Sequence, residues 1–143
     1  GKDSANGFYR DSFNYDKFLE LLIKPFVNNE NSCKTKYFNL EKDEKIDSEC
    51  ISISNKSILI LDGIFLFKPE LVHYWDYKIY LDISFETALE RNVKRSKNKS
   101  QKYIERYNKR YKAGQELYIK ESKPSLNVDI IIDNNDFNKP FIL

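Results

Sequence analysis

Three short runs of Ile, Leu, Val and aromatic residues stand out along the chain, at 57–65, 77–83 and 128–134. Each run is nearly continuous in apolar residues rather than alternating, and each carries an acidic residue near its end. This pattern is typical of strands that are buried on both faces of a parallel sheet. We therefore expect three parallel strands at these positions.

The segments after the second run have helical patterns. A helix is predicted from Phe85 to about Lys97, with Ser84 as its N-cap, and a second one from Tyr103 to about Ser122. Strands that alternate with helices indicate an α/β fold with right-handed crossovers between the parallel strands.

The first part of the chain is less regular. Apolar residues at helical spacing predict a helix from Tyr15 to about Phe26, preceded by Asn14 and ended near Pro25. Residues 28–56 are polar, and their short runs YFNL and CISIS favour a small antiparallel excursion. A doubly wound sheet needs more than three strands, so the chain is expected to start partway into its own domain.

Length and composition set the class of protein. At 143 residues and 17.0 kDa the chain suits one domain, predicted here over residues 1–143. A hydrophobic content of 41% excludes a disordered chain, and no apolar run approaches the roughly 18 residues of a membrane-spanning helix. Cys33, Cys50 and the single histidine, His73, lack zinc-ligand spacing. These features predict a cytoplasmic protein with reduced thiols and no membrane partner.

The charge is unevenly distributed. Residues 94–112 contain nine Lys and Arg residues against Glu105 alone, a net charge of +8, while the rest of the chain carries −6. Such a stretch attracts polyanions, for example nucleotides, phosphorylated metabolites or nucleic acid. The alternative is a solvated face of a surface helix. Tyrosines recur through 103–118 at helical spacing, which favours a core stripe over a platform for stacking bases.

Asp62 follows the apolar run ILIL and precedes Gly63. In open α/β sheets ligands bind outside the carboxyl ends of the strands, and phosphotransferases place a carboxylate there, near the magnesium of a bound nucleotide. An apolar strand that ends in Asp-Gly is also compatible with a plain turn. Asp62 is therefore a candidate metal ligand, with a turn as the alternative.

Arg91 and Arg95 lie four residues apart and hence on one face of the predicted helix, directly before the basic segment SKNKSQK. Guanidinium groups suit phosphate oxygens because they offer a planar fork of donors and stay charged. The pair indicates a lid that closes over phosphates, and residues 94–112 are predicted to form this basic lid and the helix that follows it. The alternative is a surface helix whose arginines pair with Glu86 or Glu90.

Five segments, in order, carry a resemblance to a known family: GKDSANGFYRDSFNYDKFLELLIKPF, FNLEKDE, ILILDGIFLFKPELVHYWDYKIYLDISFETALERNVKR, YIERYNKRYKAGQELYIKESKP and VDIIIDNNDFNKP. Together they resemble the uridine kinase-like family of P-loop phosphotransferases. The resemblance implies a three-layer P-loop kinase-type fold, a parallel sheet flanked by helices. It also implies transfer of the γ-phosphoryl group of ATP, with Mg²⁺, to the 5′-hydroxyl of a pyrimidine nucleoside or a related small molecule.

The resemblance assigns roles to residues of this chain. Asp62 matches the carboxylate near the metal, and Arg95 matches a lid arginine that stabilises the transferring phosphoryl group, supported by Arg91. Phe13 and Asn14 match the pair that holds the ribose, although the family commonly has Asp in place of Asn14. The remaining matches are Phe38 and Arg106 toward the base and Asn134 and Asn135 toward the adenine.

The sequence also departs from the family pattern. The phosphate loop Gly-x-x-x-x-Gly-Lys-Ser/Thr is absent from these residues, as is the strand-end Asp that would act as base. We expect both to lie upstream of Gly1, and the 143 residues alone to be inactive. The alternatives are a non-catalytic homologue and a basic nucleic-acid-binding module, the latter disfavoured. Family members often assemble, so a homo-oligomer stays open.

Overall fold

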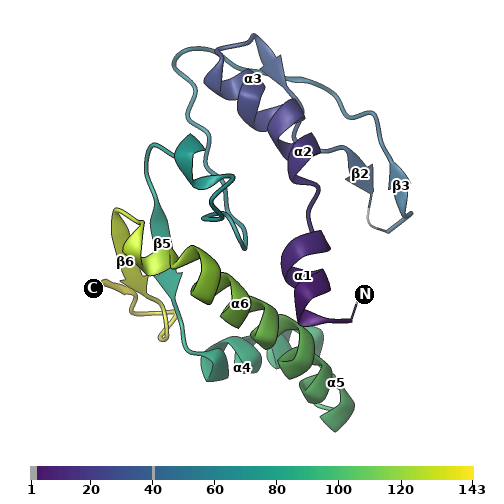
Figure 1. The fold of residues 1–143 in the computed structure, drawn as a ribbon, viewed down its shortest axis with the longest axis vertical. Helices are drawn as coiled ribbons and strands as arrows, with labels where there is room; N and C mark the ends of the chain where they lie inside the picture. Colours follow the sequence, from purple (N-terminus) through teal and green to yellow (C-terminus); the bar gives the residue numbers. More distant parts are fainter. Residues whose placement is uncertain (1–2, 40) are drawn as a thin grey trace. The chain divides into compact units, whose positions relative to one another are not determined.

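The computed structural model describes residues 3–39 and 41–143. Contacts within the chain divide it into two compact units, unit 1 with residues 1–12 and 64–143 and unit 2 with residues 13–63. Figure 1 traces both along the sequence. The two units are described separately below.

The sheet of unit 1 contains β5 (Ile79–Asp82), β6 (Ile130–Asp133) and β7 (Phe141–Ile142) in that order. β5 and β6 are parallel, with Ile79 opposite Ile130 and Asp82 opposite Asp133, whereas β7 runs antiparallel to β6. Two of the predicted strands and their parallel pairing are thus confirmed. The two-residue β7 was not predicted, and it makes the sheet mixed.

The helices of unit 1 follow two of the predicted segments closely. The first, α4 (Phe85–Ser96), begins at its Ser84 cap and ends with Lys97 in the left-handed region. The second is continuous from residue 101 to residue 122. It begins two residues earlier than predicted, because Ser100 is its N-cap. It comprises α5 (Gln101–Arg106), the π-helical turns η3 (Tyr107–Lys112) and α6 (Ala113–Ser122). Not predicted were α1 (Ala5–Asp11) and the single 3-10 turns η2 (Val72–Tyr74) and η4 (Pro124–Leu126).

The core of unit 1 is aromatic. Phe8, Tyr9, Phe65 and Tyr118 are buried together, and their rings meet edge to face or tilted. Phe65 has a φ of 63°, in the left-handed region, and the packing of its fully buried ring offsets the strain that a non-glycine residue carries there. α1 crosses α6 at Gly114, where an added Cβ would lie 2.6 Å from the Phe8 ring. This close approach explains a glycine inside a helix.

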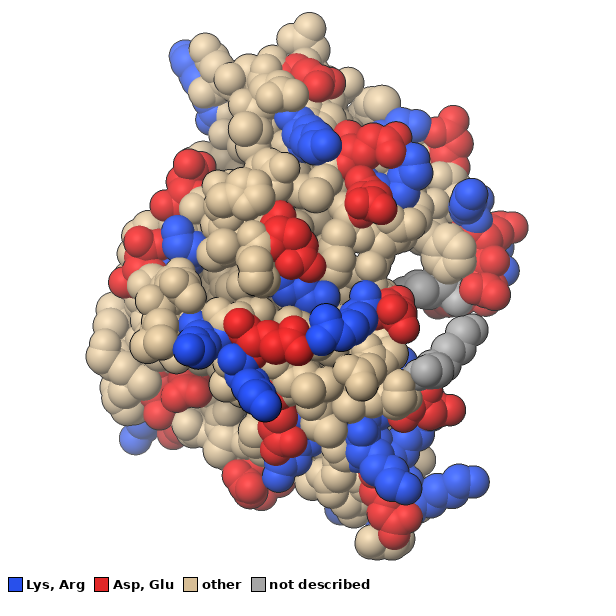
Figure 2. Space-filling view, viewed as in Figure 1, with Lys and Arg blue, Asp and Glu red and all other residues tan. Residues whose placement is uncertain are grey.

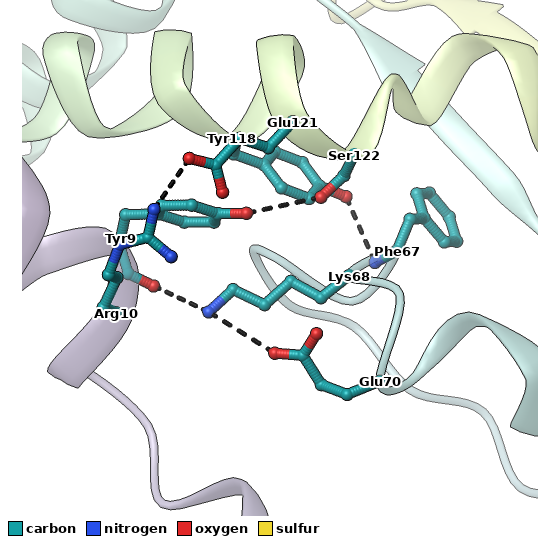
Figure 3. A network of polar contacts seen from close by, with 8 residues as sticks. All are labelled: Tyr9, Arg10, Phe67, Lys68, Glu70, Tyr118, Glu121 and Ser122. Atoms are coloured by element: carbon teal, nitrogen blue, oxygen red, sulfur yellow. Dashed lines mark hydrogen bonds and ion pairs between the residues drawn. The ribbon is translucent and has the colours of Figure 1, made fainter.

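A polar network crosses this core and joins α1, residues 67–70 and α6 (Figure 3). The Lys68 side chain is buried, and its Nζ donates to the Tyr9 carbonyl oxygen at 2.9 Å. The Phe67 amide donates to Tyr118 Oη at 3.1 Å, and Tyr9 Oη lies 3.4 Å from Ser122 Oγ. The network is not predictable from the sequence, because nothing in the pattern around residue 68 distinguishes a buried lysine from a solvated one.

Unit 2 contains the predicted helix and the predicted antiparallel excursion. The helix is continuous over α2 (Tyr15–Phe18), the π-helical turn η1 (Leu19–Ile23) and α3 (Lys24–Val27), so it extends past Pro25. β1 (Ser32–Cys33) pairs with β4 (Ile51–Ser52), and β2 (Phe38–Asn39) pairs with β3 (Glu44–Lys45), both antiparallel. The runs YFNL and CISIS therefore each contribute a strand, but to different pairs. Leu40 of YFNL lies outside the described residues.

The strand predicted over 57–65 is not formed. Residues 57–63 have no regular structure and pair with no strand in the described part of the chain, and Ile58 and Ile60 are each 87% exposed. The prediction is wrong because strand propensity measures how well side chains fit a buried, paired surface. No described strand supplies such a surface to this segment, so its apolar content alone does not order it.

The helices and the mixed sheet confirm the α/β class, while the three-layer arrangement and the single domain over 1–143 stay predictions. Within residues 3–39 and 41–143, no helix has both the length and the apolar character needed to cross a membrane. Cys33 is buried and Cys50 exposed, and both thiols are free.

Candidate functional site

A network of polar groups gathers at the carboxyl ends of the two parallel strands of unit 1. β5 and β6 end opposite each other at Asp82 and Asp133, and the Asn134 amide donates to the Asp82 carbonyl oxygen at 2.9 Å. Because the strands are parallel, this is the edge at which α/β proteins bind ligands. We call the residues after β6, 134–137, the post-β6 segment.

Asn135 ties the post-β6 segment to the start of α4. Its Oδ1 accepts from the Ser84 amide at 2.9 Å, and its Nδ2 lies 3.2 Å from both carboxylate oxygens of Asp133. Ser84 in turn caps α4, because its Oγ accepts from the Thr87 amide at 3.0 Å. Both polar ends of the Asn135 side chain are therefore occupied within the protein.

Arg91 reaches the same segment from the second turn of α4. Its Nη2 donates to the carbonyl oxygens of Asn134 at 2.7 Å and Asn135 at 3.2 Å, and its guanidinium lies 5.7 Å from the centre of the Phe137 ring. The structure thus brings together three of the predicted site residues, Arg91, Asn134 and Asn135. Among the described residues, neither Arg91 nor Arg95 forms an ion pair with Glu86 or Glu90.

Arg95 lies one turn later, exposed in the last turn of α4. Burial and the neighbouring Tyr103 raise the pKa of Tyr107, and the positive charge of Arg95 offsets part of this rise. Tyr103 also hydrogen-bonds through Oη to Asn92 Oδ1, which joins α5 to α4. Within the described residues, Arg95 forms no ion pair, so its guanidinium is open to an anion.

Arg106, predicted to face the base of a nucleoside, pairs with Asp3 instead. Its Nη2 and Nε donate to Asp3 Oδ1 at 2.8 Å and 3.1 Å, and both side chains are exposed. This surface pair is weak enough to exchange for another anionic or polar partner. A role of Arg106 toward a substrate stays a prediction.

The other predicted residues belong to unit 2, so no geometry between them and the arginines is described. Asp62 is exposed and lies in the irregular segment after ILIL. Asn14 caps α2 through Oδ1, which accepts from the Lys17 amide at 3.0 Å. Phe13 is half exposed with its ring 6.1 Å from that of Tyr15, and Phe38 lies in β2.

A small pocket of unit 2 was not predicted. It is lined by residues of the helix and of the segment after β1, namely Lys17, Phe18, Leu21, Leu22, Lys34, Thr35, Lys36 and Tyr37. Lys17 pairs with Glu20 at 2.7 Å, and Lys34 pairs with Asp47. Two of its three lysines are thus neutralised by acidic neighbours.

The tyrosines that recur through residues 103–118 are all buried or half-buried. Tyr107 and Tyr118 are buried, and Tyr111 packs against the core, which confirms the core stripe. Figure 2 shows Lys and Arg side chains interspersed with Asp and Glu on the visible face. The expectation that nucleic acid is not a partner stays a prediction.

Two comparisons with known proteins find matches to this chain, one by sequence and one by structure. A family model described as the phosphoribulokinase / uridine kinase family matches residues 2–139. No curated protein sequence matches the chain. A solved structure described as a possible uridine kinase from Bacillus stearothermophilus superposes with a TM-score of 0.68 at 15% identity, covering 90% of this chain and 59% of that one. At this identity the likeness shows the fold alone, and the present chain spans 59% of that protein's length.

Proposed function

The chain belongs to the phosphoribulokinase / uridine kinase family, and from this membership we propose that it acts as an ATP-dependent phosphotransferase on a small-molecule hydroxyl. The first candidate acceptor is the 5′-hydroxyl of a pyrimidine nucleoside. The family match covers the segments that carry Asp62, Arg91 and Arg95. A non-catalytic homologue is the outcome that the experiment below is designed to expose.

The observation that carries the proposal is the arrangement at the carboxyl edge of β5 and β6. α4 begins at this edge, and its last turn presents Arg95. The Arg95 side chain is exposed and forms no ion pair with any described residue. Phosphoryl transfer is catalysed mainly by positioning and by neutralising charge on the phosphate oxygens. The five donors of a guanidinium serve both purposes, so Arg95 is the residue that stabilises the transferring group.

Asp62 fits a magnesium ion that is shared with a nucleotide. Its carboxylate is exposed, and the described residues contain no group of three or more His, Cys, Asp or Glu side chains that could hold a metal by themselves. Mg²⁺ is commonly held by one or two carboxylates together with substrate phosphates and waters. Bound in this way, the ion would neutralise phosphate charge, and Asp62 would orient it.

The post-β6 segment fits the adenine of ATP through groups other than Asn135. The Asn135 side chain is occupied by Asp133 and Ser84, whereas the Asn134 side chain makes no hydrogen bond to described residues. Asn134 and the backbone of the segment would therefore meet the adenine. Phe13 and Asn14 are proposed to hold the ribose of the acceptor, with Phe38 and Arg106 toward its base.

The test is phosphoryl transfer from ATP with Mg²⁺ to uridine, cytidine, adenosine and a sugar phosphate, using the natural gene product and its D62N variant. The wild type is expected to phosphorylate one of these acceptors. D62N is expected to lose at least about 100-fold in kcat with an unchanged circular dichroism spectrum, because the amide no longer carries the charge that attracts the metal.

Two results would contradict the proposal at different points. Wild-type turnover that D62N retains would remove Asp62 from the metal site while keeping the kinase. A natural gene product that transfers phosphate to none of these acceptors, yet binds a partner without nucleotide, would identify a non-catalytic homologue.

A further inference from the structure

Arg91 differs from Arg95 in what its guanidinium contacts. The Arg91 group donates to the carbonyl oxygens of Asn134 and Asn135 and lies over the Phe137 ring, all within the post-β6 segment. A guanidinium engaged in this way has to break two charge-assisted hydrogen bonds before it can turn toward a phosphate. The two arginines lie on one helix face in the sequence pattern, but their guanidinium groups have different contacts in the structure.

We infer that Arg91 is a positioning residue that fastens the post-β6 segment to α4, so that the segment and the helix that carries Arg95 move as one body.

Two attachments at different heights along α4 support this inference. The Ser84 amide, at the start of the helix, holds the Asn135 side chain at 2.9 Å. Arg91, two turns further on, holds the backbone of the same segment at 2.7 Å. Two fixed points along a helix prevent the segment from pivoting about either one.

The segment has few other supports beyond the end of the sheet. Asn134 is held by the Asp82 carbonyl oxygen and Asn135 by the Asp133 carboxylate at the end of β6. Phe137, in contrast, is 75% exposed, and the hydrogen bonds to Asp136 come from the residues after the segment. Among the described residues, Arg91 is the one that bonds to the segment from within α4, beyond the Ser84 cap. Removing it would leave the segment attached to the start of α4 through Ser84 and to the ends of β5 and β6.

The consequence for ligands rests on the proposed function. If the post-β6 segment binds adenine, Arg91 raises the affinity of the protein for the base. Its contribution to the binding free energy is then the same for every ligand that contains adenine. An arginine that contacted phosphates would instead contribute more to ATP than to adenosine. The number of phosphates thus distinguishes fastening from phosphate binding.

The first experiment measures amide hydrogen exchange at Asn134 and Asn135 in the ligand-free natural gene product. These amides donate to the Asp82 carbonyl oxygen and to Asp133 Oδ1, each at 2.9 Å, so they report directly on the segment. R91A is expected to accelerate their exchange by about tenfold or more, and R91K by less, because lysine keeps a charged donor. E90A, an exposed neighbour on the same helix, is the matched control and is expected to change nothing.

Unchanged exchange in R91A would overturn the inference. So would equal acceleration in R91A and E90A, because that result would report fraying of α4 rather than loss of the fastening. Should R91A fail to fold, R91K decides alone: faster exchange at Asn134 and Asn135 than in the wild type, with a normal circular dichroism spectrum, supports fastening by the guanidinium, and exchange at wild-type rates overturns it.

The second experiment measures the dissociation constants of adenosine and ATP by calorimetry for the wild type, R91A and E90A. R91A is expected to weaken both ligands by the same factor, and E90A neither. A loss confined to ATP would assign Arg91 to the phosphates and overturn the inference. A wild type that binds neither ligand would contradict the proposed function, while the exchange experiment would still decide whether Arg91 fastens the segment.

Discussion

Lys68 and Arg91, both in unit 1, each donate to a backbone carbonyl oxygen, and they differ in burial. In the core, Lys68 Nζ holds the Tyr9 carbonyl at 2.9 Å, with only 5% of the residue exposed. At the strand ends, Arg91 holds the Asn134 carbonyl at 2.7 Å beside a segment that is open to solvent. The same chemistry therefore serves stability in one region and the position of a candidate ligand segment in the other.

The physical difference lies in the surroundings of the two cations. The Lys68 ammonium lies 4.3 Å from the centre of the Tyr9 ring, and burial lowers its pKa below the ordinary value. In such surroundings an unsatisfied polar group costs more free energy than it does at the surface, where water replaces the lost partner. We expect changes in the core to alter the free energy of unfolding and changes at the strand ends to alter local order. The predictions below test this contrast.

The largest effect is expected for Phe65→Ala. The Phe65 ring is 1% exposed, and its centre lies within 5.3 Å of those of Phe8, Tyr9 and Tyr118. The cavity left by the ring should lower the free energy of unfolding by about 3–5 kcal/mol, measured by urea denaturation. Phe137→Ala, at a ring that is 75% exposed, is the control and should cost less than about 1 kcal/mol. Equal losses in the two variants would remove the contrast.

A smaller loss is expected for Lys68→Ala. The substitution leaves the Tyr9 carbonyl without its charged donor inside the aromatic core, which should cost about 1–3 kcal/mol of unfolding free energy. Lys120→Ala, an exposed lysine of α6, is the control and should stay within about 0.5 kcal/mol of the wild type. A Lys68 variant as stable as the Lys120 variant would show that the network of Figure 3 adds no stability.

At the strand ends, Ser84→Ala should cost about 1 kcal/mol, because it removes the side chain that caps α4. The loss should be accompanied by faster amide exchange in the first turn of α4. Ser84→Asp, whose carboxylate can also accept from the Thr87 amide, should recover most of the loss. Failure of the aspartate to do so would mean that the hydroxyl acts through another contact.

The smallest effect is the pH dependence that Lys68 contributes. Since burial lowers its pKa below 10.5, the unfolded chain binds more protons than the folded chain between the lowered pKa and 10.5. In this window the stability of the wild type should therefore rise with pH relative to that of Lys68→Met. The raised pKa of buried Tyr9 acts in the opposite direction above 10.0, but in both proteins. A stability difference that falls toward about pH 10 would contradict the assignment.

The helices of this protein were largely predictable because their signals are local. Ser84 and Asn14 cap the helices that they were expected to cap. The helix that begins at Tyr15 ends at Val27, within one residue of its predicted end. Pro25 donates no amide hydrogen bond, and the Leu21 carbonyl oxygen one turn earlier accepts from the Lys34 amide instead. α1 was missed because its seven residues are too few for a clear apolar stripe.

The strands were predictable only where a partner exists. The runs at 77–83 and 128–134 pair with each other as β5 and β6, whereas the equally apolar run at 57–65 stays irregular. Among the candidate site residues, the pattern of arginines on one helix face was visible in the sequence, but it suggested a shared role for Arg91 and Arg95. The contact of Arg91 with the segment after β6 joins residues more than 40 positions apart, which no local pattern reveals.

The sequence by itself determined the α/β class, the capped helices, the two parallel strands and the family to which the chain belongs. These features follow from periodicity, capping and ordered motifs, which act between near neighbours in the chain. Only the tertiary structure decided which apolar run forms a strand, which lysine is buried and which arginine is left open to an anion. Those outcomes depend on partners distant in sequence, because a backbone hydrogen bond, a buried charge and an ion pair are each stabilised or excluded by what packs against them.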